Sequence, residues 1–271
     1  MKRLRGMGVT QRLMVLGTPA VIAFAAVYIL PLIFTGRYSL LSNSFERAFC
    51  GLENFRAVWG NPYFRLGMGH TLTLTLTLVA SAMAVALAVG FLLYRRTRAM
   101  GMELLILVLP LFLPSASVCA VWRTAFHTSA FSDPLSAWAA IITLFVWKYA
   151  GVGAVLIRYG LDGVPRNVIQ AAELDGAGRW RVNLEICLPI IKKQLMLVLL
   201  FFLMFAFRIY KECYLLFGEY PPEAMYLVQH YMNNQYLKLN FQYVSAAAMS
   251  FALLAAAFYG AAPLAAGRGR G

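Results

Sequence analysis

Charged residues are scarce in this sequence, and acidic residues are the scarcest of them. Asp, Glu, Lys and Arg together make up 13% of the 271 residues, about half the share that is usual in soluble proteins. So few charges could not cover the surface of a soluble enzyme or of an ordinary nucleic-acid-binding domain, and both classes are excluded. By contrast, 61% of the residues are apolar, and 24 basic residues against 11 acidic ones leave a net charge of +13. An apolar and basic chain is typical of a protein that crosses the membrane several times.

Residues that bind metals or perform catalysis are also few and scattered. The four cysteines and three histidines show no CxxC, HExxH or zinc-finger spacing, so we expect neither a metal ion nor another cofactor. The cysteines are expected to be small buried hydrophobes. No nucleophile and base lie together in an apolar run, and the phosphate-binding motif G-x-x-x-x-G-K-[ST] is absent, so we predict no catalytic residue and no enzyme activity. The residues concerned are Cys50, Cys119, Cys187, Cys213, His70, His127 and His230.

Six apolar stretches reach the length of about 20 residues that a helix needs to cross a bilayer. The first is too long for the apolar part of a signal peptide, so we expect it to remain as a span. The sequence therefore predicts an all-α, polytopic membrane protein that forms a single domain over residues 1–271. The predicted spans cover residues 13–34, 70–94, 104–126, 135–157, 195–217 and 243–264.

The second stretch contains a pattern that usually indicates a strand. Threonine and leucine alternate from Thr71 to Leu78. An open strand in lipid would leave its backbone groups unpaired, at several kcal/mol each, so we predict a helix whose threonine hydroxyls bond carbonyls one turn back. Ala80, Ala84 and Ala88 follow at four-residue spacing, and such a stripe is expected to let another helix approach closely.

The basic residues are unevenly divided between the two sides of the predicted membrane. If the N-terminus lies inside, 15 Lys and Arg residues fall on the inner side and 6 on the outer side. Positive charge favours the cytoplasmic side, so both termini are predicted to lie inside. The charge is spread over short loops rather than gathered on one face, which argues against nucleic acid as a partner.

Four charged residues lie in the interior of predicted spans, namely Lys148, Arg208, Lys211 and Glu212, whereas Arg123, near the outer end of the span 104–126, is counted with the outer side. A charge near the centre of the bilayer costs about 2.5–3.5 kcal/mol on insertion scales, so such residues usually face a cavity or a partner. Three interpretations remain open. Arg208 and Glu212 could pair along one helix face, Lys211 could extend to the outer interface, or these residues could line the path of a polar or anionic solute.

The predicted cytoplasmic loop over residues 158–194 is the most informative segment. Pro165 suits the first turn of a helix, and the residues from Gln170 to Leu174 are good helix formers. Gly176 and Gly178 suit a stop and a sharp turn. We predict a short helix, a tight glycine turn and a second amphipathic segment over residues 179–187. Taken alone, such a pattern usually indicates a plain amphipathic surface helix.

This loop resembles the EAA loop of binding-protein-dependent ABC transporter permeases, whose pattern is E-A-A-x-x-D-G-A followed further on by I-x-L-P. The residues that carry the likeness are Gln170, Ala171, Ala172, Glu173, Asp175, Gly176, Ala177, Ile186, Leu188 and Pro189. The residues 51–55 and 243–246 resemble the sugar-type members, such as the maltose and glycerol-3-phosphate permeases. The sequence departs from the family at Gln170, where the pattern has Glu, at Lys193, where Pro is expected, and at residues 218–221, which replace a Gly-Gly-Pro.

The resemblance implies a permease subunit of an ATP-driven importer for a carbohydrate or similar polar solute, in the bacterial plasma (inner) membrane. It also implies a second permease subunit as heterodimer partner, a cytoplasmic ATP-binding-cassette ATPase dimer and an extracytoplasmic solute-binding protein, in addition to membrane lipid. The residues from Gln170 to Ala177, with Leu188 and Pro189, would then contact the ATPase and couple it to alternating access. The alternative is a stand-alone secondary carrier or channel. Inverted repeats would favour that alternative, and the sequence shows none.

Overall fold

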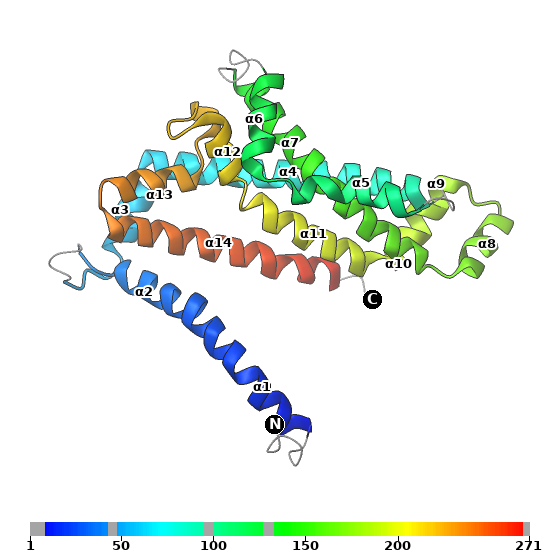
Figure 1. Ribbon diagram of the computed structural model, residues 1–271, viewed down its shortest axis with the longest axis horizontal. Coiled ribbons are helices and arrows are strands. Elements are labelled where there is room, and N and C mark those ends of the chain that lie inside the picture. Colours follow the sequence, from blue (N-terminus) through cyan, green and yellow to red (C-terminus); the bar gives the residue numbers. More distant parts are fainter. Residues whose placement is uncertain (1–8, 43–47, 95–99, 127–132, 268–271) are drawn as a thin grey trace. The chain divides into compact units, whose positions relative to one another are not determined.

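The computed structural model describes residues 9–42, 48–94, 100–126 and 133–267, and Figure 1 shows their arrangement into helices. His127 and the basic residues of segments 1–8 and 95–99 lie outside the described residues. Apart from an isolated bridge between Leu41 and Phe49, the regular structure in the described ranges is helical. The all-α prediction is therefore confirmed.

The helices follow one another with short connections. Two π-helical turns, η2 and η4, interrupt the α-helices, and η5 is a 3-10 turn. The elements are α1 Val9–Phe24, η2 Ala25–Ile29, α2 Leu30–Tyr38, α3 Glu53–Gly60, α4 Pro62–Tyr94, α5 Met100–Phe112, α6 Ser115–Ala125, α7 Pro134–Asp162, α8 Arg166–Leu174, α9 Arg179–Arg181, η4 Val182–Cys187, α10 Leu188–Ile190, α11 Lys192–Ala206, α12 Tyr210–Phe217, η5 Glu223–Met225, α13 Val228–Leu237 and α14 Phe241–Gly267.

Within the described ranges, five helical stretches are long and apolar enough to cross a membrane, and a bent pair of helices raises the number to six. They correspond to the six predicted stretches, although the second begins earlier and the fourth continues further than expected. The five are Gly17–Tyr38, Pro62–Tyr94, Pro134–Asp162, Lys192–Phe217 and Phe241–Ala261, and the bent pair is Leu104–Phe112 with Ser115–Ala125.

The third predicted span, residues 104–126, is not one straight helix. The chain bends by 98° between α5 and α6. Figure 1 shows the two helices running in clearly different directions. Two prolines explain the bend. Pro114 has no N–H to continue the helix, and a residue before proline is disfavoured in helical geometry. The chain instead closes a turn through the Leu113 N–H and the Pro110 carbonyl, and Pro114 is extended, with ψ 131°.

The chain separates into two compact units, one formed by Met1–Phe64 and Met232–Ala252 and the other by Arg65–Tyr231 and Leu253–Gly271. In the first unit, the buried Asn54 amide donates to the carbonyls of Ser39 and Leu41, at 2.9 and 2.7 Å, and so fixes the chain that follows α2. The Trp59 indole donates to the Ser250 hydroxyl at 3.2 Å and joins α3 to α14. The expectation of one membrane domain over the whole chain stays a prediction.

The core of the second unit lies where α4, α7 and α11 meet. Gly153 of α7 makes this possible, because a Cβ there would overlap the ring of Phe202 in α11 and lie 3.0 Å from Ala86 in α4. Phe202 and Ala86 are themselves completely buried. Close packing of this kind is how membrane helices associate, since lipid supplies no hydrophobic drive between them.

Helix α4 confirms the helical prediction for the alternating segment, and the face that it buries within this chain is not the alanine stripe. The hydroxyls of Thr71 and Thr77 donate to carbonyls one turn back, at 2.7 and 2.8 Å. The stripe of Ala80, Ala84 and Ala88, however, is exposed. The buried face is rotated and carries Leu78, Ala82, Ala86 and Gly90.

Glycine at position 151 is required by the contact between α5 and α7. A Cβ on Gly151 would overlap the backbone carbonyl of Leu107, whereas a Cβ on Gly260 in α14 would meet nothing. We expect Gly151→Ala to force the two helices apart and to lower the free energy of unfolding by about 1–3 kcal/mol. Thermal unfolding in detergent measures this effect, with Gly260→Ala as the matched control. If both variants unfold with the wild type, the contact is not close-packed.

Candidate functional site

The loop between α7 and α11, residues 163–191, contains the predicted helix and glycine turn. Helix α8 covers most of the motif, from Gln170 to Leu174, and Asp175 is its C-cap residue. The Ala177 N–H then bonds the Ala172 carbonyl, the Gly176 N–H bonds the Glu173 carbonyl, and Gly176 has φ +82°. This is the Schellman arrangement, in which the left-handed position favours glycine.

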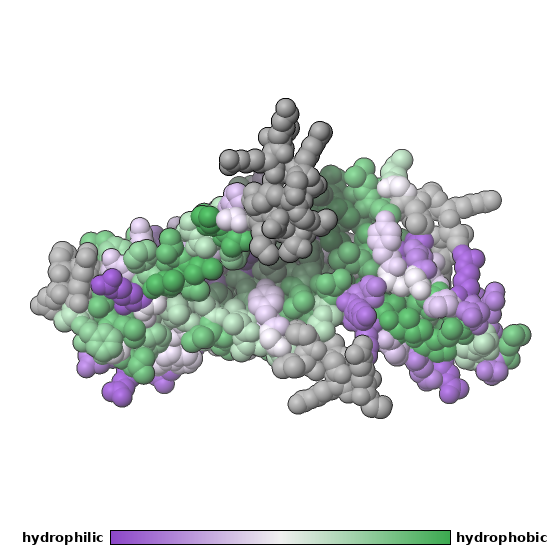
Figure 2. All heavy atoms as spheres, turned by 90° about the horizontal axis from the view of Figure 1, so that it is seen from below, coloured by the Kyte–Doolittle hydropathy of each residue, from purple (hydrophilic) through white to green (hydrophobic). Residues whose placement is uncertain are grey.

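The motif residues of this loop are accessible. In the described chain no residue of α8 is buried, and Leu174 and Trp180 are 88% and 79% exposed. Hydrophilic side chains gather in Figure 2 at the end where Figure 1 places α8 and α9. Leu188 and Pro189 lie apart from α8, in α10, which leads directly into α11. The loop therefore presents an exposed helix between two spans.

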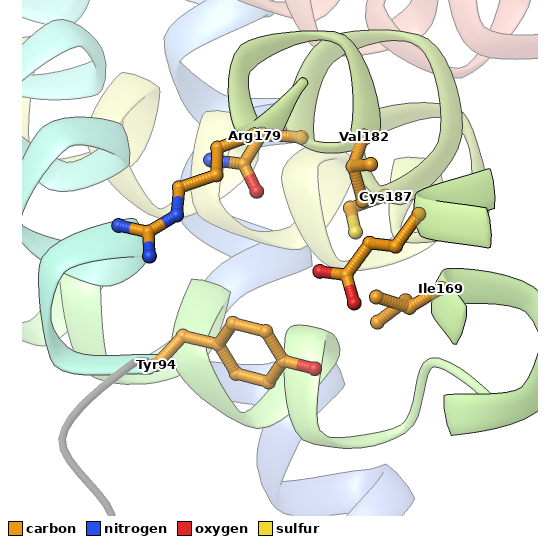
Figure 3. Close-up of a pocket in the computed structure, with 7 residues that line it drawn as sticks. Tyr94, Ile169, Arg179, Val182 and Cys187 are labelled. Atoms are coloured by element: carbon orange, nitrogen blue, oxygen red, sulfur yellow. The ribbon is translucent and has the colours of Figure 1, made fainter. Parts of the chain in front are cut away.

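A cavity of about 340 Å³ lies beneath this helix, between α8, the end of α4 and the second amphipathic segment. Figure 3 shows the ring of Tyr94 crossing the cavity toward Ile169, with Val182 and Cys187 on the opposite wall. Burial raises the pKa of the Cys187 thiol, so this thiol stays protonated and behaves as a small apolar side chain. A second cavity, of about 590 Å³, is lined by Gln170 and also by Tyr94 and Ile169.

The entry to the loop is attached to the neighbouring helix α4. The buried Arg158 guanidinium donates to the Leu93 carbonyl, at 2.8 Å, near the end of α4. It also pairs with Asp162 at 3.3 Å. A cation at the C-terminal end of a helix satisfies a carbonyl that has no partner within the helix. The ends of α4 and α7 are thus fixed to each other next to the loop.

Two of the charged residues within the spans, Lys148 and Glu212, form a cluster with Ser115 that the sequence did not predict. Lys148 of α7 donates to the Glu212 carboxylate of α12 at 3.0 Å and to the Ser115 hydroxyl of α6 at 2.8 Å. Ser115 in turn donates to the same carboxylate oxygen at 2.8 Å. Lys148 and Glu212 are each only 4% exposed. The pair is therefore structurally satisfied and desolvated.

The interpretation that Arg208 pairs with Glu212 is wrong, because Glu212 bonds Lys148 and Ser115 instead. Arg208 and Lys211 are exposed on the same stretch of chain, and neither has an ion pair among the described residues. The stretch is also irregular. Between α11 and α12 the N–H groups of Arg208 and Ile209 bond carbonyls only three residues back, so the helix is interrupted at these residues.

A second polar site, at His230, gave no sign in the sequence, because an isolated histidine fits no motif. His230 is 1% exposed, its Nδ1 accepts from the Leu227 N–H at 3.0 Å, and its ring contacts those of Tyr210 and Tyr226. Burial lowers the pKa of His230 to about 4. The adjacent segment packs on α4, where the Val228 N–H donates to the Thr71 hydroxyl at 3.0 Å.

Comparison with known proteins identifies the class of this molecule. The family of binding-protein-dependent transport system inner membrane components matches residues 80–266, more than half of the chain. The chain therefore belongs to this family. More particularly, it is a permease subunit of an ABC importer in the inner membrane, and ATP hydrolysis belongs to a separate subunit. This membership decides against a stand-alone carrier or channel.

Individual relatives agree with this assignment. The chain is 27% identical to the sulfoquinovosyl glycerol transport system permease protein SmoG of Agrobacterium fabrum, over 78% of this chain and 77% of that protein. It is 25% identical to the trehalose transport system permease protein SugA of Mycobacterium tuberculosis, over 74% and 71%. Its fold matches a bacterial ABC transporter involved in the import of the acidic polysaccharide alginate, with a TM-score of 0.77, 20% identity and coverage of 96% and 98%.

The Lys148–Glu212 pair leads to a first prediction about this site. Either Lys148→Met or Glu212→Gln alone is expected to lower the free energy of unfolding by about 3–5 kcal/mol, because one buried charge then loses its partner. The double variant Lys148→Met/Glu212→Gln removes both charges and should recover most of that loss. Denaturant unfolding in detergent gives the coupling energy. Additive losses in the double variant would show that the two side chains do not act as a pair.

A second prediction concerns the pH dependence caused by His230. The pKa of His230 in the folded chain is about 4, which lies below the ordinary value of about 6.5. The neutral ring therefore contributes its full stabilisation above about pH 6.5. This stabilisation is lost as the pH falls from about 6.5 toward 4, and it amounts to about 3 kcal/mol. His230→Asn keeps an acceptor for the Leu227 N–H but does not titrate in this range. Thermal unfolding over this pH range should therefore show a flatter profile for His230→Asn, and parallel profiles would contradict the assignment.

Proposed function

We propose that the chain is the permease subunit of an importer for a carbohydrate or a similar polar solute, and that the loop over residues 163–191 couples a separate ATPase to alternating access. The family and the two relatives named for sulfoquinovosyl glycerol and trehalose support the solute class. Each of those relatives matches about three quarters of this chain, so the likeness extends well beyond the motif.

One observation carries the coupling role: α8 is an exposed helix that ends in a rigid turn. A helix with no buried residue gains little from its own chain, and its apolar side chains need a partner to cover them. The most exposed apolar side chains next to the turn are Leu174, which precedes it, and Trp180, which follows it. We assign them to a cleft of the ATPase. Gln170, Glu173 and Asp175 would then offer hydrogen bonds at its rim, with the amide of Gln170 in place of a carboxylate.

The uneven distribution of Lys and Arg supports an orientation with both termini and this loop in the cytoplasm. The family description, which names dependence on a binding protein, supports an extracytoplasmic solute-binding protein as a partner. We propose a second permease subunit and an ATPase dimer as the further partners. The exposed apolar surface of α1 and α2 leaves room for lipid or a second subunit, since none of Gly17–Tyr38 is buried in the described chain.

The turn at Gly176 supplies the test. A β-branched side chain is strongly disfavoured at φ +82°, so Gly176→Val should redirect the chain after α8. We expect uptake per ATP hydrolysed to fall by about tenfold in the reconstituted transporter. Gly178 is the matched control, because its φ is −66° and a Cβ there meets nothing.

Gly178→Ala should transport at the wild-type ratio. If Gly176→Val assembles with the ATPase and also keeps that ratio, the turn has no part in coupling. If the purified chain transports without an ATPase, the proposed function itself fails.

A further inference from the structure

The four charged residues in the interior of the spans divide into a paired set and an unpaired set. Lys148 and Glu212 neutralise each other in the buried cluster with Ser115. Arg208, between α11 and α12, and Lys211, in the first turn of α12, remain, and both are exposed and positive. Met204, one helical turn before Arg208, is 41% exposed. We call the surface of Met204, Arg208 and Lys211 the cationic face.

This face lies deep in its span. The span Lys192–Phe217 has 26 residues, so its midpoint falls next to Met204. At a rise of 1.5 Å per residue, Arg208 lies about 5 Å and Lys211 about 10 Å beyond the midpoint. Both positions are within the hydrocarbon core, which extends about 15 Å to each side. A charge at this depth faces water or a partner rather than lipid.

The surroundings of the cationic face suit a ligand that is only partly charged. Tyr149 of α7 stacks on Phe205 of α11, with ring centroids 4.4 Å apart, and Phe201 packs edge-on against Phe205 at 4.8 Å. Phe201 and Phe205 are half-buried, one or two turns before Arg208. A small-molecule site typically combines such an aromatic wall with a few charged groups that fix orientation.

We propose that the cationic face is a subsite for an oxyanion, and that the transported solute is a carbohydrate or polyol that carries a sulfonate, phosphate or carboxylate group. Arg208 offers a planar fork of donors that matches such an oxyanion, and Lys211 adds a second positive charge one turn further along the chain. This inference rests on the proposed function, because the face must border the solute path.

The charge preference of the face can be measured without knowing the solute. The transporter carrying Met204→Cys is treated in membranes with anionic sulfonatoethyl methanethiosulfonate or with cationic trimethylammonioethyl methanethiosulfonate. Each rate is divided by the rate of that reagent with free mercaptoethanol. We expect the corrected ratio to favour the anionic reagent by about tenfold, because two nearby positive charges attract it. The transporter without the new cysteine supplies the background, and its Cys119, Cys187 and Cys213 are buried.

Arg208→Gln together with Lys211→Gln should bring the corrected ratio to parity. Lys238→Gln, which removes an exposed lysine outside the spans, should leave the ratio unchanged. No reaction at position 204 would show that lipid or a protein covers the face. Equal rates before the substitutions would show that its charges are already neutralised, for example by acidic residues of the second permease subunit. Either result overturns the proposal.

The solute itself supplies a second, independent measurement. The binding protein of the same transporter is purified from its native host, and the small molecule that it retains is identified by mass spectrometry. An acidic sugar or polyol supports the proposal, and a solute without an acidic group overturns it. Neither measurement uses ATP, so a transporter that fails to couple hydrolysis to uptake would count against the proposed function and not against the charge preference of this face.

Discussion

A polar group inside an apolar protein must find a partner, and the cluster of Lys148, Glu212 and Ser115 is where this requirement shapes the second unit. These buried side chains find their partners in one another. The three of them therefore hold α6, α7 and α12 in one arrangement. Ser115 is the first residue of α6, directly after the bend at Pro114. A straight helix would carry its hydroxyl elsewhere. The bend therefore brings the third partner to the pair, and the pair in turn holds the bend.

Local rules explain which parts of this structure the sequence could predict. The spans follow from the length of the apolar runs, and the helix through Thr71 follows from the need to pair every backbone group in lipid. The turn at Gly176 follows from helix formers that end at a glycine. These rules depend on residues within one or two helical turns of each other, and such relations can be read directly from the sequence.

The parts that could not be predicted depend on residues far apart in the chain. Lys148 and Glu212 are 64 residues apart, so reasoning about neighbours on one helix could only suggest Arg208 as the partner of Glu212. The buried face of α4 could not be predicted from the sequence either. Small and apolar residues occur all around that helix, and only the position of Gly153 and Phe202 on the neighbouring helices selects Ala86 over Ala84. The angle of the bend in the third span could not be predicted either, because it depends on what α6 packs against.

Whether a charged residue has a partner within the chain distinguishes a structural charge from a functional one. A charged residue within a span is not by itself a sign of function, because Lys148 and Glu212 have each other and the Ser115 hydroxyl. Arg208 and Lys211 sit at an interrupted helix, remain exposed, and have no acidic partner in the described chain. In membrane transporters, interrupted helices and charged residues that have no partner within the chain commonly line the site that binds the solute. The pairing within the chain, rather than the presence of charge, is therefore the property that directs attention to the α11–α12 junction.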